Sequence, residues 1–304
     1  MNETQNSQIF NQRLQHCATL IEARLREWLA NSERHGFVPN RLAEAMRHAV
    51  LGGGKRLRPF LVLESARLCG MPDEAALNAG AALECIHCYS LVHDDLPAMD
   101  DDDMRRGRPT VHKAFDEATA ILAGDALLTL AFEILADPVT HPDPAIRCAL
   151  ALGLARASGR AGMAGGQMLD LLAPRVTPSE ADIKRLQAMK TGALILFACE
   201  AGANLANAGP VQRQALRDYG TALGLAFQLA DDLLDVDGDA AILGKAVAKD
   251  KDAGKATLVG LMGGDAARER LAEFQGQALN ALAPFGPDAD MLAATVDFVA
   301  NRKH

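Results

Sequence analysis

The chain has 304 residues, a formal net charge of −8 and 49% hydrophobic residues, but only 4% aromatic ones. This length suits one large helical domain, and the abundance of Ala and Leu favours helix. The negative charge and the lack of a long basic stretch argue against a nucleic-acid partner. The polar start, MNETQNSQ, does not resemble a signal peptide, and no run approaches about eighteen uninterrupted apolar residues. We therefore expect a cytoplasmic protein without a membrane span.

Helical spacing of apolar residues recurs almost everywhere and strand alternation is nearly absent, which predicts an all-α protein. No Ser/Gly/Pro-rich linker divides the chain, so we expect a single domain over residues 1–304. The longest expected irregular segment is 236–257, and polar loops of this length are often functional. The expected helices span residues 8–30, 39–50, 58–69, 73–95, 116–136, 143–159, 178–206, 211–235, 265–283 and 287–301.

The six cysteines lie mostly in apolar helical surroundings, which predicts reduced, buried thiols. Cys85 and Cys88 have a CxxC spacing with His87 between them. One such pair without a second is a weak indication of a zinc site.

The first basic motif is GGGKRLRP, at residues 52–59. It lacks the GxxxxGK[ST] pattern of a P-loop. Its glycines nevertheless permit a close approach, and Arg binds phosphate oxygens through two N–H groups. Lys55, Arg56 and Arg58 are thus candidate phosphate ligands, although a single basic residue is more often a solvated surface charge.

The stretch HDDLPAMDDDDMRRGRPT, residues 93–110, places six carboxylates between Asp94 and Asp103 and then three arginines. A solvated acidic loop is one interpretation. The other is a cation bound among the aspartates, with an anion beside the arginines. Pro97 disfavours helix in its predecessor, so the chain can leave the helix and return Asp100 to the neighbourhood of Asp94.

A second acidic motif, QLADDLLDVDGD, follows at residues 228–239. Asp231 and Asp235 lie on one helical face with Asp232 beside them. Carboxylates in so apolar a helix are costly unless they are paired or bind metal. Like Asp94 and Asp95, the neighbouring residues Asp231 and Asp232 are expected at the end of their helix.

Hard carboxylate oxygens suit Mg²⁺, which takes one or two of them and completes its shell with water and substrate phosphates. Two facing Asp clusters would hold several Mg²⁺ ions around one diphosphate. For either cluster alone, a charged helix end remains the alternative. Lys190, in the apolar MKTGAL segment, either extends towards solvent or points at an anion.

Together these motifs resemble the trans-polyprenyl diphosphate synthase family. DDLPAMD with DMRRGRPT, and LAFQLADDLLD, are similar to its two aspartate-rich motifs, while GGGKRLRP, AGGQMLD (residues 164–170) and MKTGAL occur in the family's order. The resemblance runs from about residue 41 to the C-terminus. Within the family it is greatest to bacterial farnesyl diphosphate synthases.

The resemblance implies an isoprenoid synthase type I fold, with ten or more helices around a central cavity, and a homodimer. It implies condensation of isopentenyl diphosphate, head to tail (1′-4), with dimethylallyl and geranyl diphosphate, giving (E,E)-farnesyl diphosphate. About three Mg²⁺ ions per site, replaceable by Mn²⁺, would assist ionisation, condensation and elimination.

The resemblance also assigns roles to individual residues. The implied Mg²⁺ ligands are Asp94, Asp95, Asp100, Asp231, Asp232 and Asp235, of which Asp94, Asp100 and Asp231 would be catalytic with Lys190 and Lys245. The implied ligands of the allylic diphosphate are Arg105, Lys190, Thr191, Gln228, Lys245 and Lys255. The implied ligands of isopentenyl diphosphate are Lys55, Arg58, His87 and Arg106.

Product length is expected to depend on the helix before the first motif. Tyr89, five places before Asp94, occupies the position where a bulky residue forms the tunnel floor in this family, and Ser90 is its neighbour. The alternative for Tyr89 is a core aromatic with a bonded hydroxyl. His93 is expected to be structural rather than catalytic.

Four rival functions remain. A geranylgeranyl diphosphate synthase would share the fold and add one condensation, and a terpene cyclase would share the fold and an acidic motif. A non-catalytic subunit would bind prenyl diphosphates, and an acidic Ca²⁺-binding module is disfavoured because no EF-hand loop occurs. Leu258-Val259 and Ala248 depart from the family pattern near the long loop.

Overall fold

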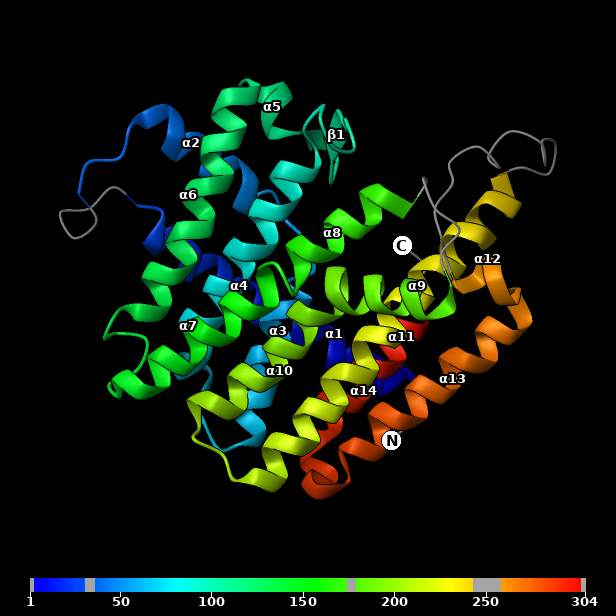
Figure 1. Cartoon of the computed structure of the whole chain (residues 1–304). Helices are drawn as coiled ribbons and strands as arrows, with labels where there is room; N and C mark the ends of the chain where they lie inside the picture. Colours follow the sequence, from blue (N-terminus) through cyan, green and yellow to red (C-terminus); the bar gives the residue numbers. More distant parts are fainter. Residues whose placement is uncertain (1–2, 31–35, 174–178, 243–257, 302–304) are drawn as a thin grey trace. The chain divides into compact units, whose positions relative to one another are not determined.

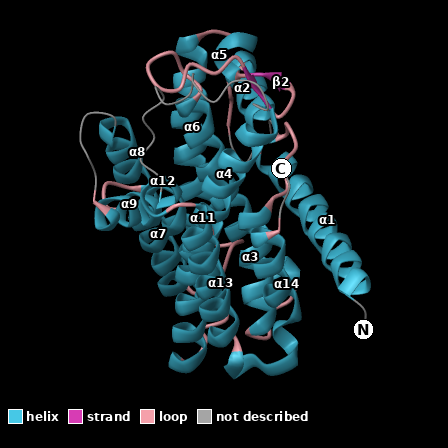
Figure 2. Cartoon of the chain, turned by 90° about the vertical axis from the view of Figure 1, so that its right-hand side faces the viewer, coloured by secondary structure: helices cyan, strands magenta, loops and turns pink. Residues whose placement is uncertain are grey.

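The computed structural model describes residues 3–30, 36–173, 179–242 and 258–301. Helices make up nearly all of the structure in these ranges (Figure 2). The described strands are the two-residue β1 (Met104–Arg105) and β2 (Arg108–Pro109), which pair antiparallel. The prediction of an all-α protein is confirmed.

The chain divides into two compact units. The first comprises Met1–Leu152 with Asn204–Asn207, and the second Gly153–Ala203 with Ala208–His304. The first unit contains α1 (Glu3–Trp28), α2 (Asn40–Val50), α3 (Leu57–Leu68), α4 (Asp73–Asp94), α5 (Val111–Ala114), α6 (Glu117–Ala136) and the start of α7 (Pro144–Ser158). The second contains the rest of α7, α8 (Met163–Leu172), α9 (Glu180–Gln187), the π-helix η2 (Ala188–Gly192), most of α10 (Ala193–Leu205), α11 (Pro210–Ile242), α12 (Leu258–Met262), α13 (Gly264–Ala281), the 3₁₀ segment η4 (Ala283–Ala289) and α14 (Asp290–Ala300).

Helix α4 is the central helix of the first unit, in contact with α1, α2, α3 and α6 (Figure 1). Its sequence is apolar on most sides, as expected of a helix surrounded by others. Small residues let its neighbours approach closely. A Cβ atom on Gly80, for instance, would lie 2.8 Å from Cδ1 of Ile21 in α1. This packing fixes the helix that carries the first acidic motif.

A buried ion pair joins three elements of the first unit. Arg56, just before α3, has a fully buried side chain and donates to Glu84 Oε1 of α4 at 2.6 Å. It also contacts Glu22 of α1 at 3.2 Å and donates to the carbonyl of Val50 at 2.6 Å. Among the basic residues of GGGKRLRP, Arg56 therefore has a structural role.

Helix α6 is long and apolar enough to cross a membrane by length and composition alone, and 44% of its most apolar window is buried. Core helices of soluble proteins pass the same test, and α6 packs on α4 and α2. It is weak support for a membrane span.

In the second unit, α11 packs along α13, and their apolar faces form a core with residues of α9 and α12. The hydroxyl of Tyr219 in α11 donates to the carbonyl of Leu292 in α14 at 2.8 Å. Ile183, Leu229, Leu258 and Phe274 are among the buried members of this core. These contacts anchor α11, which carries the second acidic motif, between Tyr219 and Leu233.

Several expected elements differ from the observed ones. Residues 236–242 continue α11 instead of beginning a loop, so Asp231 lies inside this helix and not at its end. The expected helix 178–206 is three segments, with its first N-cap at Ser179. Helices α5, α8 and α12 were not predicted, because α5 and α12 are short and two glycines weaken the helical pattern of α8.

The six cysteines are free thiols. Cys17, Cys85, Cys88 and Cys199 are buried as predicted, whereas Cys148 is exposed. Burial raises the pKa of the Cys88 thiol to about 12, so this member of the CxxC pair stays protonated at neutral pH.

Candidate functional site

The first acidic motif begins where α4 ends. After Asp94 the chain turns, and the backbone N–H of Asp100 donates to the carbonyl of Asp94 at 2.8 Å. The turn contains Pro97, and Asp101 follows it with a left-handed φ of 54°. The predicted return of Asp100 to Asp94 is confirmed.

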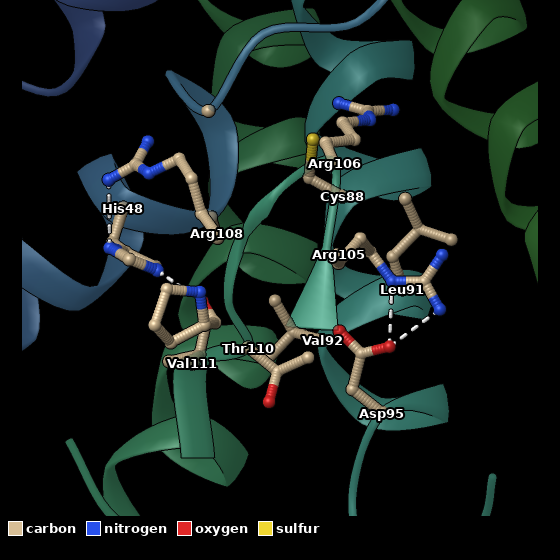
Figure 3. A pocket seen from close by; sticks show the side chains of 13 residues that line it. His48, Cys88, Leu91, Val92, Asp95, Arg105, Arg106, Arg108, Thr110 and Val111 are labelled. Carbon is tan, nitrogen blue, oxygen red and sulfur yellow. Dashed lines mark hydrogen bonds and ion pairs between the residues drawn. The ribbon is translucent and has the colours of Figure 1, made fainter. Parts of the chain in front are cut away.

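Asp95 is buried and bound to an arginine of the same motif. Arg105, in β1, donates from Nε to Asp95 Oδ1 at 2.7 Å, and its Nη2 lies 2.6 Å from the same oxygen. Burial raises the pKa of Asp95, and Arg105 opposes that shift. Asp95, a predicted Mg²⁺ ligand, is thus paired with Arg105, a predicted ligand of the allylic diphosphate (Figure 3).

The hairpin β1–β2 carries the three arginines against a small cavity of about 40 Å³. Arg108 contacts His48 Nδ1 at 3.0 Å, and His48 Nε2 lies 2.8 Å from the carbonyl of Pro109 (Figure 3). The residues that line the cavity also include Cys88, Leu91, Val92, Asp95, Arg105, Arg106, Thr110 and Val111.

The glycines of GGGKRLRP admit Arg106. Its guanidinium donates to the carbonyl of Gly53, and a Cβ atom on Gly54 would lie 2.6 Å from Arg106 Nη1. The predicted close approach therefore occurs, but the group that approaches is a side chain of the protein. The contact with Gly53 places Arg106 beside the loop that carries Lys55. Lys55 is exposed.

Arg58 and His87 meet across α3 and α4, with Arg58 Nη1 at 3.5 Å from His87 Nε2. Burial, followed by the charge of Arg58, holds the pKa of His87 well below its ordinary value. His87 is thus neutral near pH 7, as a neutral hydrogen-bond donor to a diphosphate would be.

In the second unit, Asp232 is held by two amides. Its carboxylate accepts from Gln187 Nε2 at 2.7 Å and from Gln228 Nε2 at 3.0 Å. Thr191 Oγ1 donates to Gln228 Oε1 at 2.8 Å. Three of the predicted residues, Thr191, Gln228 and Asp232, therefore form one hydrogen-bonded chain.

Lys190 is paired with Asp170, the last residue of AGGQMLD, at 2.6 Å. It lies in the π-helix η2, a wider helical turn that often marks functional positions. A Cβ atom on Gly166 would lie 2.6 Å from Lys190 Cα, so this glycine lets α8 touch η2. The motif AGGQMLD thus positions Lys190.

The remaining predicted residues vary in how far the structure describes them. Asp231 is half-buried in α11. Asp235 lies in the same helix, but its side chain is outside the described part of the chain. Lys245 and Lys255 lie outside the described residues.

The chain-length candidates lie on the last turns of α4. Tyr89 and Ser90 are half-buried, and Ser90 Oγ donates to the carbonyl of His87 at 2.9 Å. Burial, followed by the charge of Asp94, raises the pKa of Tyr89. Tyr89 is therefore an un-ionised, partly apolar side chain close to the acidic motif.

Three partners in these arrangements were not predicted from the sequence. They are Asp170 for Lys190, Gln187 for Asp232 and Gly53 for Arg106. Two belong to motifs that the sequence displays, AGGQMLD and GGGKRLRP. Gln187 carries no local signal, because only the packing of α9 on α11 brings it to Asp232.

The carboxylates fit Mg²⁺ by their chemistry. Within the described ranges, no three His, Cys, Asp or Glu side chains gather into a preformed metal site. One or two aspartates with water and substrate phosphates are, however, the usual ligands of Mg²⁺. Asp94 in the first unit and Asp231 in the second are each half-buried, so each could be one of these ligands.

Comparison with known proteins agrees with these motifs. The sequence model of the polyprenyl synthetase family matches residues 39–281. The chain is 44% identical over 301 residues to the farnesyl diphosphate synthase of Escherichia coli K12, covering 96% of this chain and 99% of that protein. It is 40% identical to geranylgeranyl pyrophosphate synthase 9 of Arabidopsis thaliana, covering 87% and 75%.

Among solved structures, an FPP/GFPP synthase from Zymomonas mobilis is similar over 97% of this chain and 99% of its own. The identity is 44% and the TM-score 0.87. The observed helices thus follow the isoprenoid synthase fold. This chain belongs to the polyprenyl synthetase family.

Proposed function

We propose that the protein is a Mg²⁺-dependent farnesyl diphosphate synthase, which condenses isopentenyl diphosphate with dimethylallyl and then geranyl diphosphate. The observation that carries the proposal is the return of Asp100 to Asp94 at the end of α4, with arginines directly after it. The 44% identity to a farnesyl diphosphate synthase over almost the whole chain supports it.

The reaction needs charge neutralisation more than proton transfer by the protein. The allylic C–O bond breaks heterolytically, and the diphosphate leaves with the bonding electrons. The alkene of isopentenyl diphosphate then forms the new C–C bond with the allylic carbon, and the released diphosphate takes the proton that is lost. No protein base is required.

The aspartates of both motifs would hold about three Mg²⁺ ions, which neutralise the leaving diphosphate when bound. Among the protein's own groups, Lys190, Thr191 and Gln228 would bind the allylic diphosphate, joined by Arg105, Lys245 and Lys255. Arg105 would first have to exchange its contact with Asp95 for one with phosphate oxygens, because the two groups are paired.

Isopentenyl diphosphate would bind at Lys55, Arg58, His87 and Arg106. The contact between Arg58 and His87 supports this assignment. The neutral state of His87 is compatible with it, because one nitrogen of a neutral imidazole can donate to a phosphate oxygen. We further propose that the two units form a single polyprenyl synthetase domain, because the family match, residues 39–281, runs through both. A homodimer in the cytoplasm is part of the same proposal.

The proposal is tested by incubating the purified protein with Mg²⁺, labelled isopentenyl diphosphate and either allylic starter, followed by dephosphorylation and chromatography of the alcohols. A dominant C15 alcohol that disappears with EDTA is the expected result. A dominant C20 alcohol would instead support the geranylgeranyl diphosphate synthase. No product from either starter would favour a subunit that binds prenyl diphosphates without catalysis.

Tyr89→Ala is expected to lengthen the product, from C15 towards C20. Removing the ring opens roughly one helical turn, about 5.4 Å, along α4. Chromatography of the labelled alcohols measures the ratio. An unchanged C15 product would remove Tyr89 from the role of tunnel floor.

A further inference from the structure

His93 fastens the end of α4 to α6. Its Nε2 lies 3.1 Å from the carbonyl oxygen of Ile121 and donates to it in the tautomer that carries the hydrogen on Nε2. The same nitrogen lies 4.0 Å from Asp125 Oδ1, one turn further along α6. The imidazole of His93, the residue directly before Asp94, is thus bound to the backbone of the neighbouring helix α6.

Only a glycine at position 124 leaves room for this ring. A Cβ atom on Gly124 would lie 2.8 Å from His93 Cε1 and closer still to Nε2 and Cδ2. Real Cβ atoms essentially never come this close to other heavy atoms. Glycine also lowers helix stability relative to alanine in the interior of a helix such as α6, so its presence here has a packing reason.

The same imidazole supports Tyr89. The two residues are four apart on α4 and therefore neighbours on one helical face. Their rings meet edge to face, with centroids 5.8 Å apart and an interplanar angle of 79°. This is the preferred geometry of aromatic pairs, and it restricts the orientations open to the Tyr89 ring.

These contacts form one continuous arrangement, from Ile121 and Gly124 through His93 to Tyr89. We propose that His93 and Gly124 are positioning residues for product length: Gly124 makes the space in which His93 is held, and His93 holds the Tyr89 ring across the path of the growing prenyl chain. The inference rests on the proposed prenyltransferase function and on Tyr89 as the floor of the tunnel.

Two single variants disturb the arrangement in different ways. In Gly124→Ala the new methyl group displaces the imidazole from Ile121 and Tyr89. In His93→Ala the ring is absent, and nothing can clash. Each variant is expected to raise the C20 to C15 product ratio several-fold in the assay with labelled isopentenyl diphosphate and geranyl diphosphate.

The double variant identifies the route of the effect. If Gly124→Ala acts by displacing the imidazole, it adds nothing further in the His93→Ala background, which has no imidazole to displace. Gly276→Ala is the matched control, because a Cβ atom there, inside α13, would meet nothing within 4 Å. It should leave the product ratio unchanged.

The outcomes separate the inference from the function on which it rests. C15 from the wild type and unchanged ratios in Gly124→Ala and His93→Ala would overturn the inference alone. Effects of the two substitutions that multiply in the double variant would overturn it as well. If the wild type makes no prenyl product from either starter, the proposed function fails and the inference fails with it. If Gly124→Ala does not fold, the ratio of His93→Ala decides.

Discussion

Asp94→Asn is expected to lower kcat by a factor on the order of 10² to 10³, the usual effect of removing one group that stabilises charge in a transition state. Asparagine keeps the shape of the side chain and the backbone carbonyl that accepts from Asp100. The substitution removes only the negative charge that would bind Mg²⁺. Initial rates at saturating Mg²⁺ and both substrates measure the loss.

Asp101→Asn is the matched control for this prediction. Asp101 is exposed, lies in the same acidic run and has a left-handed φ of 54°, which asparagine adopts readily. The kcat of Asp101→Asn should stay near that of the wild type. Equal losses in the two variants would mean that overall negative charge matters and that Asp94 has no special role.

Arg56→Met is expected to lower the free energy of unfolding by about 3–5 kcal/mol, because it leaves the carboxylate of Glu84 buried without its cation. The Arg56 side chain is fully buried and that of Glu84 is 2% exposed. Methionine has a similar volume, so little of the effect comes from a cavity. Urea-induced unfolding followed by circular dichroism measures the change.

Two further variants test the cause. Arg217→Met breaks a pair with Glu200 of similar length, 2.7 Å, but at the surface, and should cost less than about 1 kcal/mol. Glu84→Gln added to Arg56→Met should restore part of the loss by removing the unpaired charge. A double variant no more stable than Arg56→Met would contradict this explanation.

Local chemistry in the sequence was sufficient to predict four helices of the first unit and the turn after Asp94. Helical spacing marks α2, α3, α4 and α6 to within a residue or two. Pro97 signals where the backbone must leave α4, and the hydrogen bond from Asp100 to Asp94 follows. Both depend on neighbours along the chain.

Pairings that depend on packing could not be predicted in this way. Nothing near Asp95 indicates that it would bind Arg105, because the hairpin β1–β2 brings the arginine back. The aspartate-rich pattern of the second motif likewise suggested a helix end, whereas α11 continues to Ile242.

The central proposal is that the aspartates of each acidic motif are needed for the Mg²⁺-dependent binding of a diphosphate. Isothermal titration of inorganic pyrophosphate into the protein, with and without Mg²⁺, tests it for the wild type, Asp94→Asn and Asp231→Asn. We predict binding by the wild type only when Mg²⁺ is present, and strongly weakened binding in each variant. Wild-type affinity in either variant, or binding that does not depend on Mg²⁺, would contradict the claim.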